Sequence, residues 1–153
     1  MATMGELNQH SADRPQADAV QSAPHGIPVI RTIAMPADTN PAGDIFGGWL
    51  MAQMDLAAGS VATRRARGRC ATVMVEGMTF LSPVFVGDEV SLYAELANEG
   101  RSSMKIKVEA WRRHREEESL TRVTEAIFTF VAIGGDRRPR ALPPADPAPR
   151  TTA

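Results

Sequence analysis

The feature that most constrains the fold of this chain is a set of stretches in which apolar and polar residues alternate. These stretches follow one long apolar segment. Apolar and polar side chains alternate along much of residues 70–84, 90–96, 103–110 and 120–134. Alternation with a period of two predicts strands with one buried face. The β-branched run 28–35, which stops at Pro36, predicts one further strand. The pattern therefore predicts an antiparallel sheet of five strands.

One long helix is predicted ahead of the alternating stretches, over residues 45–63. Its side chains are apolar at helical spacing and on most other positions too, as in Trp49, Leu50, Met51, Met54, Leu56, Ala57 and Val61. Such a helix is predicted to be buried nearly all round. The order β-α-β-β-β-β predicts an α+β fold in which the sheet wraps around the helix. Because one sheet of this size cannot also hide its own edges, we expect at least a homodimer.

The segments outside this pattern are predicted to be tails. Residues 1–27 are rich in Ala, Gln, Ser, Asp and Pro and lack periodic apolar spacing, which predicts a disordered N-terminal tail. Residues 136–153 are rich in proline and are predicted to be a disordered C-terminal tail. The folded domain is therefore predicted to span residues 28–135.

Charge and composition exclude several classes of function. The net charge of -1 and the isoelectric point near 6.3 give no electrostatic basis for binding nucleic acid or an anionic membrane surface. No apolar run has the length of a signal peptide or a membrane span, so neither export nor membrane insertion is expected. The single cysteine, Cys70, suits a reducing cytoplasm and excludes an intramolecular disulfide or a cysteine zinc site. P-loop, dinucleotide-binding, serine-hydrolase and HExxH zinc motifs are also absent.

Two glycines, Gly47 and Gly48, stand at the start of the predicted helix, just after Asp44. Each helical glycine costs about 1 kcal/mol relative to alanine. Asp44 has two interpretations: it is an N-cap carboxylate, or it takes part in chemistry. Capping alone does not require the glycines, whereas missing side chains matter where a ligand comes close to the backbone.

The chemical interpretation of this stretch is attack on a carbonyl. A helix N-terminus offers unpaired N–H donors to an oxygen that gains negative charge, and Gly47 and Gly48 would let the carbonyl approach. Asp44 could take a proton from water or attack the carbonyl itself. A free aspartate is a weak base at neutral pH, and the sequence does not choose between the two routes.

At this point the chain resembles a known family. The segments "MPADTNPAGDIFGGWLMAQMDLAAG", "VEGMTFLSPVFVGDEV", "GRSSMKIKVEAW" and "EAIFTFVAI" are similar in order and spacing to YciA-type acyl-CoA thioesterases of the hotdog fold. The resemblance implies an active site built across a homodimer interface, with Asp44 as catalytic carboxylate and the Gly47 and Gly48 amides polarising the thioester. It implies assembly into a homohexamer, as a trimer of dimers. Asn40 and Asp38 also match the family element, where Asn40 either shapes the loop or contacts substrate.

The substrate implied by the resemblance, acyl-CoA, needs positive charge for its phosphates. Arg101, Ser102, Ser103 and Lys105 offer a guanidinium, hydroxyls and an ammonium at the start of a strand. The alternative is a solvated hairpin without a ligand. Further candidates are Arg64, Arg65, Arg67 and Arg69, which could equally complement the dipole of the predicted helix.

The resulting hypothesis is hydrolysis of acyl-CoA to a free carboxylic acid and coenzyme A, as in fatty acid metabolism, with no metal and no further cofactor. A hydratase on the same fold would use a histidine, and the helix region has none. His10 and His25 fall in the predicted tail, and His114 falls in a charged hairpin that we interpret as solvated. The remaining alternative is a non-catalytic acyl-CoA-binding or assembly module. Acyl chain length is not fixed by the sequence.

Overall fold

The computed structural model describes residues 22–147. Its elements are β1 (Ile30–Ile33), a 3-10 turn η1 (Pro36–Asp38), α1 (Gly47–Ala66), β2 (Cys70–Glu76), β3 (Glu89–Glu99), β4 (Ser103–Arg113) and β5 (Thr121–Ala132). The predicted order of strands around one helix is confirmed. The helix begins and ends slightly later than predicted, with Arg67 closing it in the left-handed conformation.

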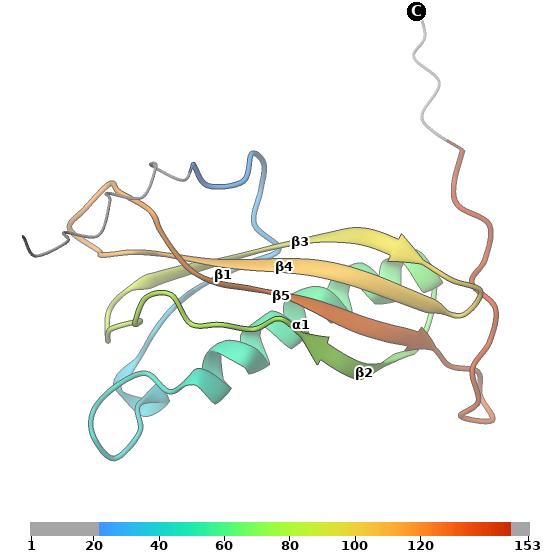
Figure 1. Cartoon of the computed structure of the whole chain (residues 1–153), viewed down its shortest axis with the longest axis horizontal. Helices are drawn as coiled ribbons and strands as arrows, with labels where there is room; N and C mark the ends of the chain where they lie inside the picture. The colour runs from blue at the N-terminus through green and yellow to red at the C-terminus, as the bar shows by residue number, and fades with distance from the viewer. Residues whose placement is uncertain (1–21, 148–153) are drawn as a thin grey trace, which may run out of the picture.

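The strands form one antiparallel sheet in the order β1-β3-β4-β5-β2. Figure 1 shows the sheet curving along the whole length of α1, which lies against one of its faces. β2 forms one edge of the sheet and pairs with β5 alone among the described residues. This arrangement is the hotdog fold predicted from the sequence.

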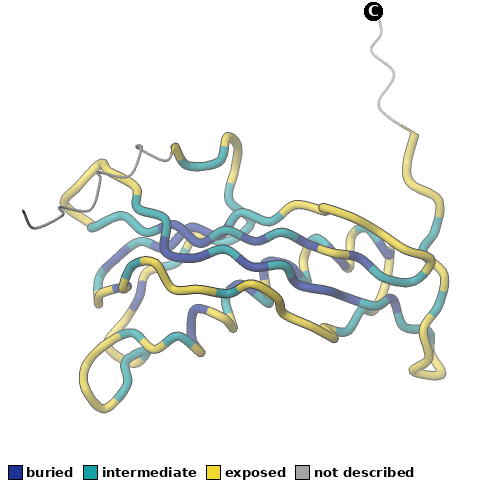
Figure 2. The backbone as a smooth tube through the Cα atoms, viewed as in Figure 1, coloured by how far each residue is buried: buried dark blue, intermediate teal, exposed yellow. Residues whose placement is uncertain are grey.

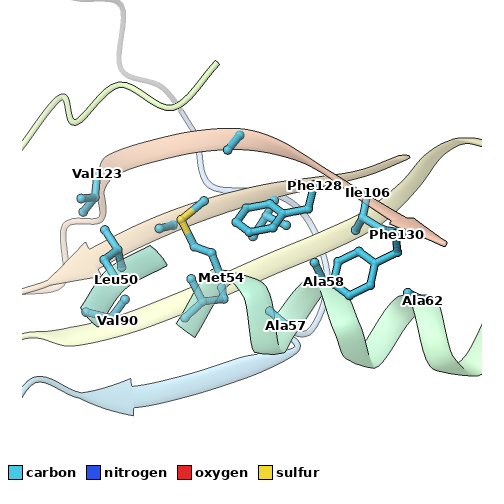
Figure 3. Close-up of a cluster of buried hydrophobic side chains, with 14 of the residues drawn as sticks. Leu50, Met54, Ala57, Ala58, Ala62, Val90, Ile106, Val123, Phe128 and Phe130 are labelled. Carbon is cyan, nitrogen blue, oxygen red and sulfur yellow. The ribbon is translucent and has the colours of Figure 1, made fainter. Parts of the chain in front are cut away.

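The core lies between α1 and the concave face of the sheet. In Figure 3 Leu50 of α1 lies near Val123 of β5, and Met54 points toward Phe128 of the same strand. All four side chains are buried. Burying each such side chain stabilises the fold by roughly 1.5–3 kcal/mol. Alanines of α1 let the helix approach the sheet closely: Ala57, Ala58, Ala62 and Ala66 are fully buried. The predicted alternation matches the buried face of β4, whereas β2 has no buried residue.

One side of α1 is exposed, contrary to the prediction of a helix buried nearly all round. Leu56 is 60% exposed and Met51 is 40% exposed. The neighbouring edge strand β2 carries further exposed apolar side chains, with Val73 at 57% and Met74 at 50%. Figure 2 shows this exposed margin along the sheet. A single chain therefore leaves apolar surface uncovered where its helix and its edge strand meet.

The strand predicted over residues 70–84 ends at Glu76. Gly77 follows with φ of 70°, a left-handed conformation that breaks the extended chain. The following residues run beside β5 without forming a regular strand. Thr124 Oγ1 donates a hydrogen bond to the Thr79 carbonyl at 2.7 Å, and the Leu81 N–H donates one to the Val123 carbonyl at 2.7 Å. This loop brings Phe80 to the start of α1.

Residues 136–143, which we call the C-terminal strap, correct the predicted domain boundary. The Arg140 N–H donates to the Ala132 carbonyl at 2.9 Å, and the Leu142 N–H donates to the Arg101 carbonyl at 2.8 Å. Leu142 also packs against the core. The boundary predicted at residue 136 is therefore too early, because backbone bonds hold the strap on the sheet despite its prolines. Of the two predicted tails, residues 1–21 and 148–153 lie outside the described residues.

Candidate active site

The loop between η1 and α1 is closed by Asn40. Asn40 Oδ1 accepts hydrogen bonds from the N–H groups of Ala42 at 3.0 Å and Asp44 at 3.1 Å. The Asn40 N–H donates to the Asp44 carbonyl at 2.8 Å, and Thr39 bridges to Ile45. Because two of these bonds involve its backbone, Asp44 is held in a fixed place relative to α1. These contacts fit the loop-shaping role that was one alternative for Asn40.

The first turn of α1 has no side-chain cap. Its N-cap residue is Phe46, which cannot accept a hydrogen bond from the turn. The Trp49 N–H donates to the Phe46 carbonyl at 3.1 Å, whereas the N–H groups of Gly47 and Gly48 have no partner among the described residues. The N-cap interpretation of Asp44 is therefore wrong. Two free donors remain at the positive end of the helix dipole.

Asp44 itself lies exposed two residues before the N-cap. Within residues 22–147, no group donates a hydrogen bond to its carboxylate, although its backbone is bonded at both N–H and carbonyl. Its carboxylate is therefore available to a bound molecule. An available carboxylate and two available N–H donors thus share one short loop and helix start.

The two glycines make room for aromatic rings. A β carbon on Gly47 would lie 2.8 Å from the ζ carbon of Phe80, and one on Gly48 would lie 3.2 Å from the ring of Phe46. Both rings are partly exposed, Phe46 at 42% and Phe80 at 49%. The sequence led us to expect the glycines to admit a ligand, and in this structure Phe80 occupies the space beside Gly47.

An apolar groove opens beside these glycines. It has a volume of about 400 Å³ and is lined by Phe46, Gly47, Leu50, Phe80 and Val123 among others. Apolar walls with a few polar groups are typical of small-molecule sites. The groove therefore suits an apolar chain whose polar head lies at the helix start.

The residues predicted to bind phosphate lie far from this groove within one chain. Arg101 and Ser102 lie in the turn between β3 and β4 and Ser103 begins β4, near the C-terminal end of α1. Lys105 lies two positions along β4 from Ser103, on the face of the sheet opposite the buried Met104 and Ile106. A helix of 20 residues is about 30 Å long, and α1 separates this turn from Asp44. One chain alone does not bring the predicted phosphate-binding residues close to Asp44.

The four further candidate arginines differ in their contacts. Arg65 Nε donates to Glu99 at 2.8 Å, and this hydrogen bond holds the pKa of the Glu99 carboxyl below its usual range. Arg67 pairs with Asp146, and Arg64 Nε donates to the Ser60 carbonyl at 3.2 Å. The Arg69 side chain has no hydrogen bond or ion pair with any described residue.

A buried network that the sequence analysis missed involves His114. Its Nδ1 lies 2.6 Å from Oδ1 of Asp88, a carboxylate that is only 2% exposed as a residue. Asp88 Oδ2 also accepts from the Phe85 N–H at 3.0 Å and lies 3.7 Å from Arg112 Nη1. His114 was interpreted as part of a solvated hairpin. The signal that could have found the network is strand register, because Glu89 pairs with Arg113.

Two features are absent from the described residues. No group of three or more His, Cys, Asp or Glu side chains within residues 22–147 is arranged to hold a metal ion. In the same part of the chain, no helix combines the length and apolarity required to cross a membrane.

Comparisons with known proteins give a consistent result. The sequence model of the thioesterase superfamily matches residues 42–119. The acyl-CoA thioester hydrolase YciA of Escherichia coli is 50% identical over 125 residues, which cover 80% of this chain and 95% of that protein.

Two crystal structures resemble the fold closely. The hexameric thioesterase y2039 of Yersinia pestis has a TM-score of 0.75 and 50% identity, covering 80% of this chain and 100% of that one. The hexameric hotdog fold thioesterase Cj0915 of Campylobacter jejuni has a TM-score of 0.72 and 35% identity, covering 77% and 91%.

Proposed function

This chain belongs to the thioesterase superfamily, and from that premise we propose how it acts as an acyl-CoA thioester hydrolase that releases a free carboxylic acid and coenzyme A. The observation that carries the proposal is the uncapped first turn of α1. There the N–H groups of Gly47 and Gly48 and the carboxylate of Asp44 are all left available by the fold.

The proposed oxyanion site consists of the Gly47 and Gly48 N–H groups. In thioester hydrolysis the carbonyl oxygen becomes negatively charged as the carbonyl carbon turns tetrahedral. Donors that are already oriented toward that oxygen stabilise this state, and each is worth roughly 100-fold to 1000-fold in rate. The helix dipole adds to the effect because its positive end faces the same place.

Asp44 is proposed to supply the carboxylate of the reaction. By one route it takes a proton from water, whose oxygen attacks the thioester carbonyl; the tetrahedral state then collapses and expels the coenzyme A thiolate, which is protonated. By the other route Asp44 attacks the carbonyl, coenzyme A leaves, and water opens the resulting anhydride. Both routes consume one water and yield the same products. The proposed reaction uses neither a metal nor another cofactor.

The apolar groove beside Gly47 is proposed to hold the acyl chain. Its volume of about 400 Å³ and its lining by Leu50, Phe80 and Val123 suit an alkyl group that enters with its carbonyl toward the helix start. Burial of that alkyl group would contribute about 0.8 kcal/mol for each methylene. The depth of the groove then decides which chain lengths are accepted.

We also propose that the working unit contains at least two copies of the chain. The exposed edge strand β2 would pair with β2 of a second copy, which would cover Val73 and Met74 and remove an open sheet edge. Antiparallel pairing places the Cys70 end of one β2 beside the Glu76 end of the other. The Arg101 turn of one copy thereby approaches the Asp44 loop of its partner. Assembly of such dimers in threes is proposed from the hexameric relatives.

The test is release of free thiol from acyl-CoAs of short, medium and long chain by the purified protein. We expect turnover with at least one of them. A folded, oligomeric protein that binds acyl-CoA but releases no thiol would contradict the proposal and favour an acyl-CoA-binding module.

A further inference from the structure

The apolar groove beside Gly47 has one wall made of core side chains. Leu50 of α1, Val84 and Val123 of β5 line it, and all three are buried within the hydrophobic core. Figure 3 shows Leu50 and Val123 close together there. Side chains in a close-packed core are held in place by their neighbours on every side. This wall of the groove is therefore rigid.

The ring of Phe80 forms a different kind of wall. It also lines the groove, but it is half exposed, and it meets α1 at Gly47, where no side chain holds it. Exposed side chains change rotamer on the picosecond to nanosecond timescale. The Phe80 ring is therefore the part of the groove that can move most easily.

The backbone on both sides of Phe80 is fixed to β5. The Thr79 carbonyl accepts a hydrogen bond from Thr124 Oγ1 at 2.7 Å, and the Leu81 N–H donates one to the Val123 carbonyl at 2.7 Å. Two bonds to the same strand hold the main chain in place while the side chain between them stays free to turn. Movement at this position is thus confined to the ring.

Met51 lies one helical turn beyond the contact between Phe80 and Gly47. It follows Gly47 by four positions, which places the two residues on the same face of α1. Met51 is 40% exposed and does not line the groove. The ring against Gly47 therefore stands between the groove and Met51. Methionine side chains are flexible and adapt to ligands of different shape.

We propose that Phe80 determines which acyl chain lengths the groove accepts. With its ring against Gly47 the groove ends at Phe80 and holds a short acyl chain. With the ring turned away, the groove continues toward Met51 and holds a longer one. Turning the ring costs its contact with Gly47, and the additional methylenes that a long chain buries offset this cost. The inference rests on the proposed function and names the residue that sets its substrate range.

The test measures kcat/KM for two thioesters that differ only in chain length. Butyryl-CoA and octanoyl-CoA are compared with wild type, Phe80→Ala and Phe80→Trp, and the readout is the ratio of kcat/KM for octanoyl-CoA to that for butyryl-CoA. Phe80→Ala is expected to raise this ratio about tenfold, the low end of what one methylene is worth in an apolar pocket. Phe80→Trp, with its larger ring, is expected to lower the ratio.

Two results would overturn the inference. One is a ratio that stays unchanged in Phe80→Ala, including an equal loss of activity toward both thioesters, which would show that the ring serves only as a wall. The other is a ratio that stays unchanged or rises in Phe80→Trp. The second result decides the question alone if Phe80→Ala does not fold, as judged by thermal unfolding.

Phe85→Ala is the matched control. Phe85 is a half-exposed phenylalanine on the same loop between β2 and β3, but it does not line the groove. Its ring stacks on His114, with the ring centroids 5.7 Å apart. This variant is expected to leave the ratio at the wild-type value. A rise equal to that in Phe80→Ala would show that any truncation on this loop relaxes the groove, and would overturn the inference while leaving the proposed function intact.

A binding measurement separates this inference from the proposed function. S-butyl-CoA and S-octyl-CoA carry their alkyl groups through a thioether and cannot be hydrolysed. Each is titrated calorimetrically into wild type and into Phe80→Ala. The affinity for S-octyl-CoA relative to S-butyl-CoA is expected to rise about tenfold in the variant, even if the protein releases no thiol from any acyl-CoA. An unchanged relative affinity, or no binding of either thioether to wild type, overturns the inference whatever the enzymatic result.

Discussion

The ring of Phe80 lies against Gly47, with its ζ carbon 2.8 Å from the point that a β carbon on Gly47 would occupy. A loop after β2 and the start of α1 are thereby fitted to each other beside the groove. The glycine at the helix start is explained by this contact, together with the free N–H donors beside it.

The contact predicts that Gly47→Ala destabilises the protein slightly, by up to about 1 kcal/mol, because the half-exposed Phe80 ring must move away from the added methyl. In a Phe80→Leu background the same change should be neutral or stabilising, since alanine is the better helix former. Gly59→Ala is the control within α1, because its β carbon would lie 3.6 Å from Phe130, an ordinary contact. Chemical denaturation of the four proteins measures these differences. A loss of stability at Gly47 that persists without Phe80 would contradict the explanation.

Asn40 predicts a second effect, on the loop that carries Asp44. Asn40→Ala removes the acceptor of the Ala42 and Asp44 N–H groups, so we expect a loss of about 1 kcal/mol in stability and a fall in kcat. Asn40→Asp keeps an accepting oxygen and should retain most of the stability. Thermal unfolding and thiol release measure the two effects. An equal fall of kcat in both variants, with stability retained in Asn40→Asp, would mean that the amide acts on substrate and not on the loop.

The buried Asp88 predicts a large effect on stability. Asp88→Ala leaves Arg112 and His114 without their shared carboxylate, and removing one partner from a buried charged network costs about 3–5 kcal/mol. His114→Ala should cost less, because Asp88 keeps Arg112 and the Phe85 N–H. Urea denaturation of both variants gives the comparison. Similar small losses would show that Asp88 is adequately solvated.

Much of this fold could be predicted because its signals are local. Alternation along β4 places Ile106 and Val108 in the core directly, and the apolar segment from Leu50 onward defines the helix. The strap could not be predicted in this way. Its prolines indicate a chain without regular structure, and the bonds that hold Arg140 and Leu142 come from residues far away in the sequence.

The candidate site was predicted in part for the same reason. Asp44 and Gly47 are close in sequence, so their proximity required no knowledge of the fold. The pairing of His114 with Asp88 depends on the register of β3 and β4, and the position of Phe80 depends on a loop that bends at Gly77. Sequence spacing alone contains neither relationship.

The lowered pKa of Glu99 predicts a dependence of stability on pH. Its carboxylate accepts a hydrogen bond from Arg65, so the charged form is favoured in the folded state and the pair stabilises the fold at neutral pH. This contribution is fully present above the ordinary pKa of a glutamate and is lost as the pH falls through the lowered value. Melting temperatures of wild type and Glu99→Gln should therefore differ at pH 7 and converge in acid. A difference that is independent of pH would contradict the assignment.

The most direct test of the proposed chemistry is the turnover of Asp44→Asn on a good acyl-CoA substrate. Because the Asp44 carboxylate makes no bond within the described chain, the variant should fold, assemble and melt like wild type. Its kcat is expected to fall about 1000-fold, which lies within the roughly 100-fold to 10,000-fold contribution typical of a general base. Asp38→Asn is the control. The wild-type Asp38 Oδ2 accepts a hydrogen bond from the Met35 N–H just before the same loop, and this variant should keep most of the activity. Turnover near the wild-type rate in a well-folded Asp44→Asn would show that this carboxylate does not carry the reaction.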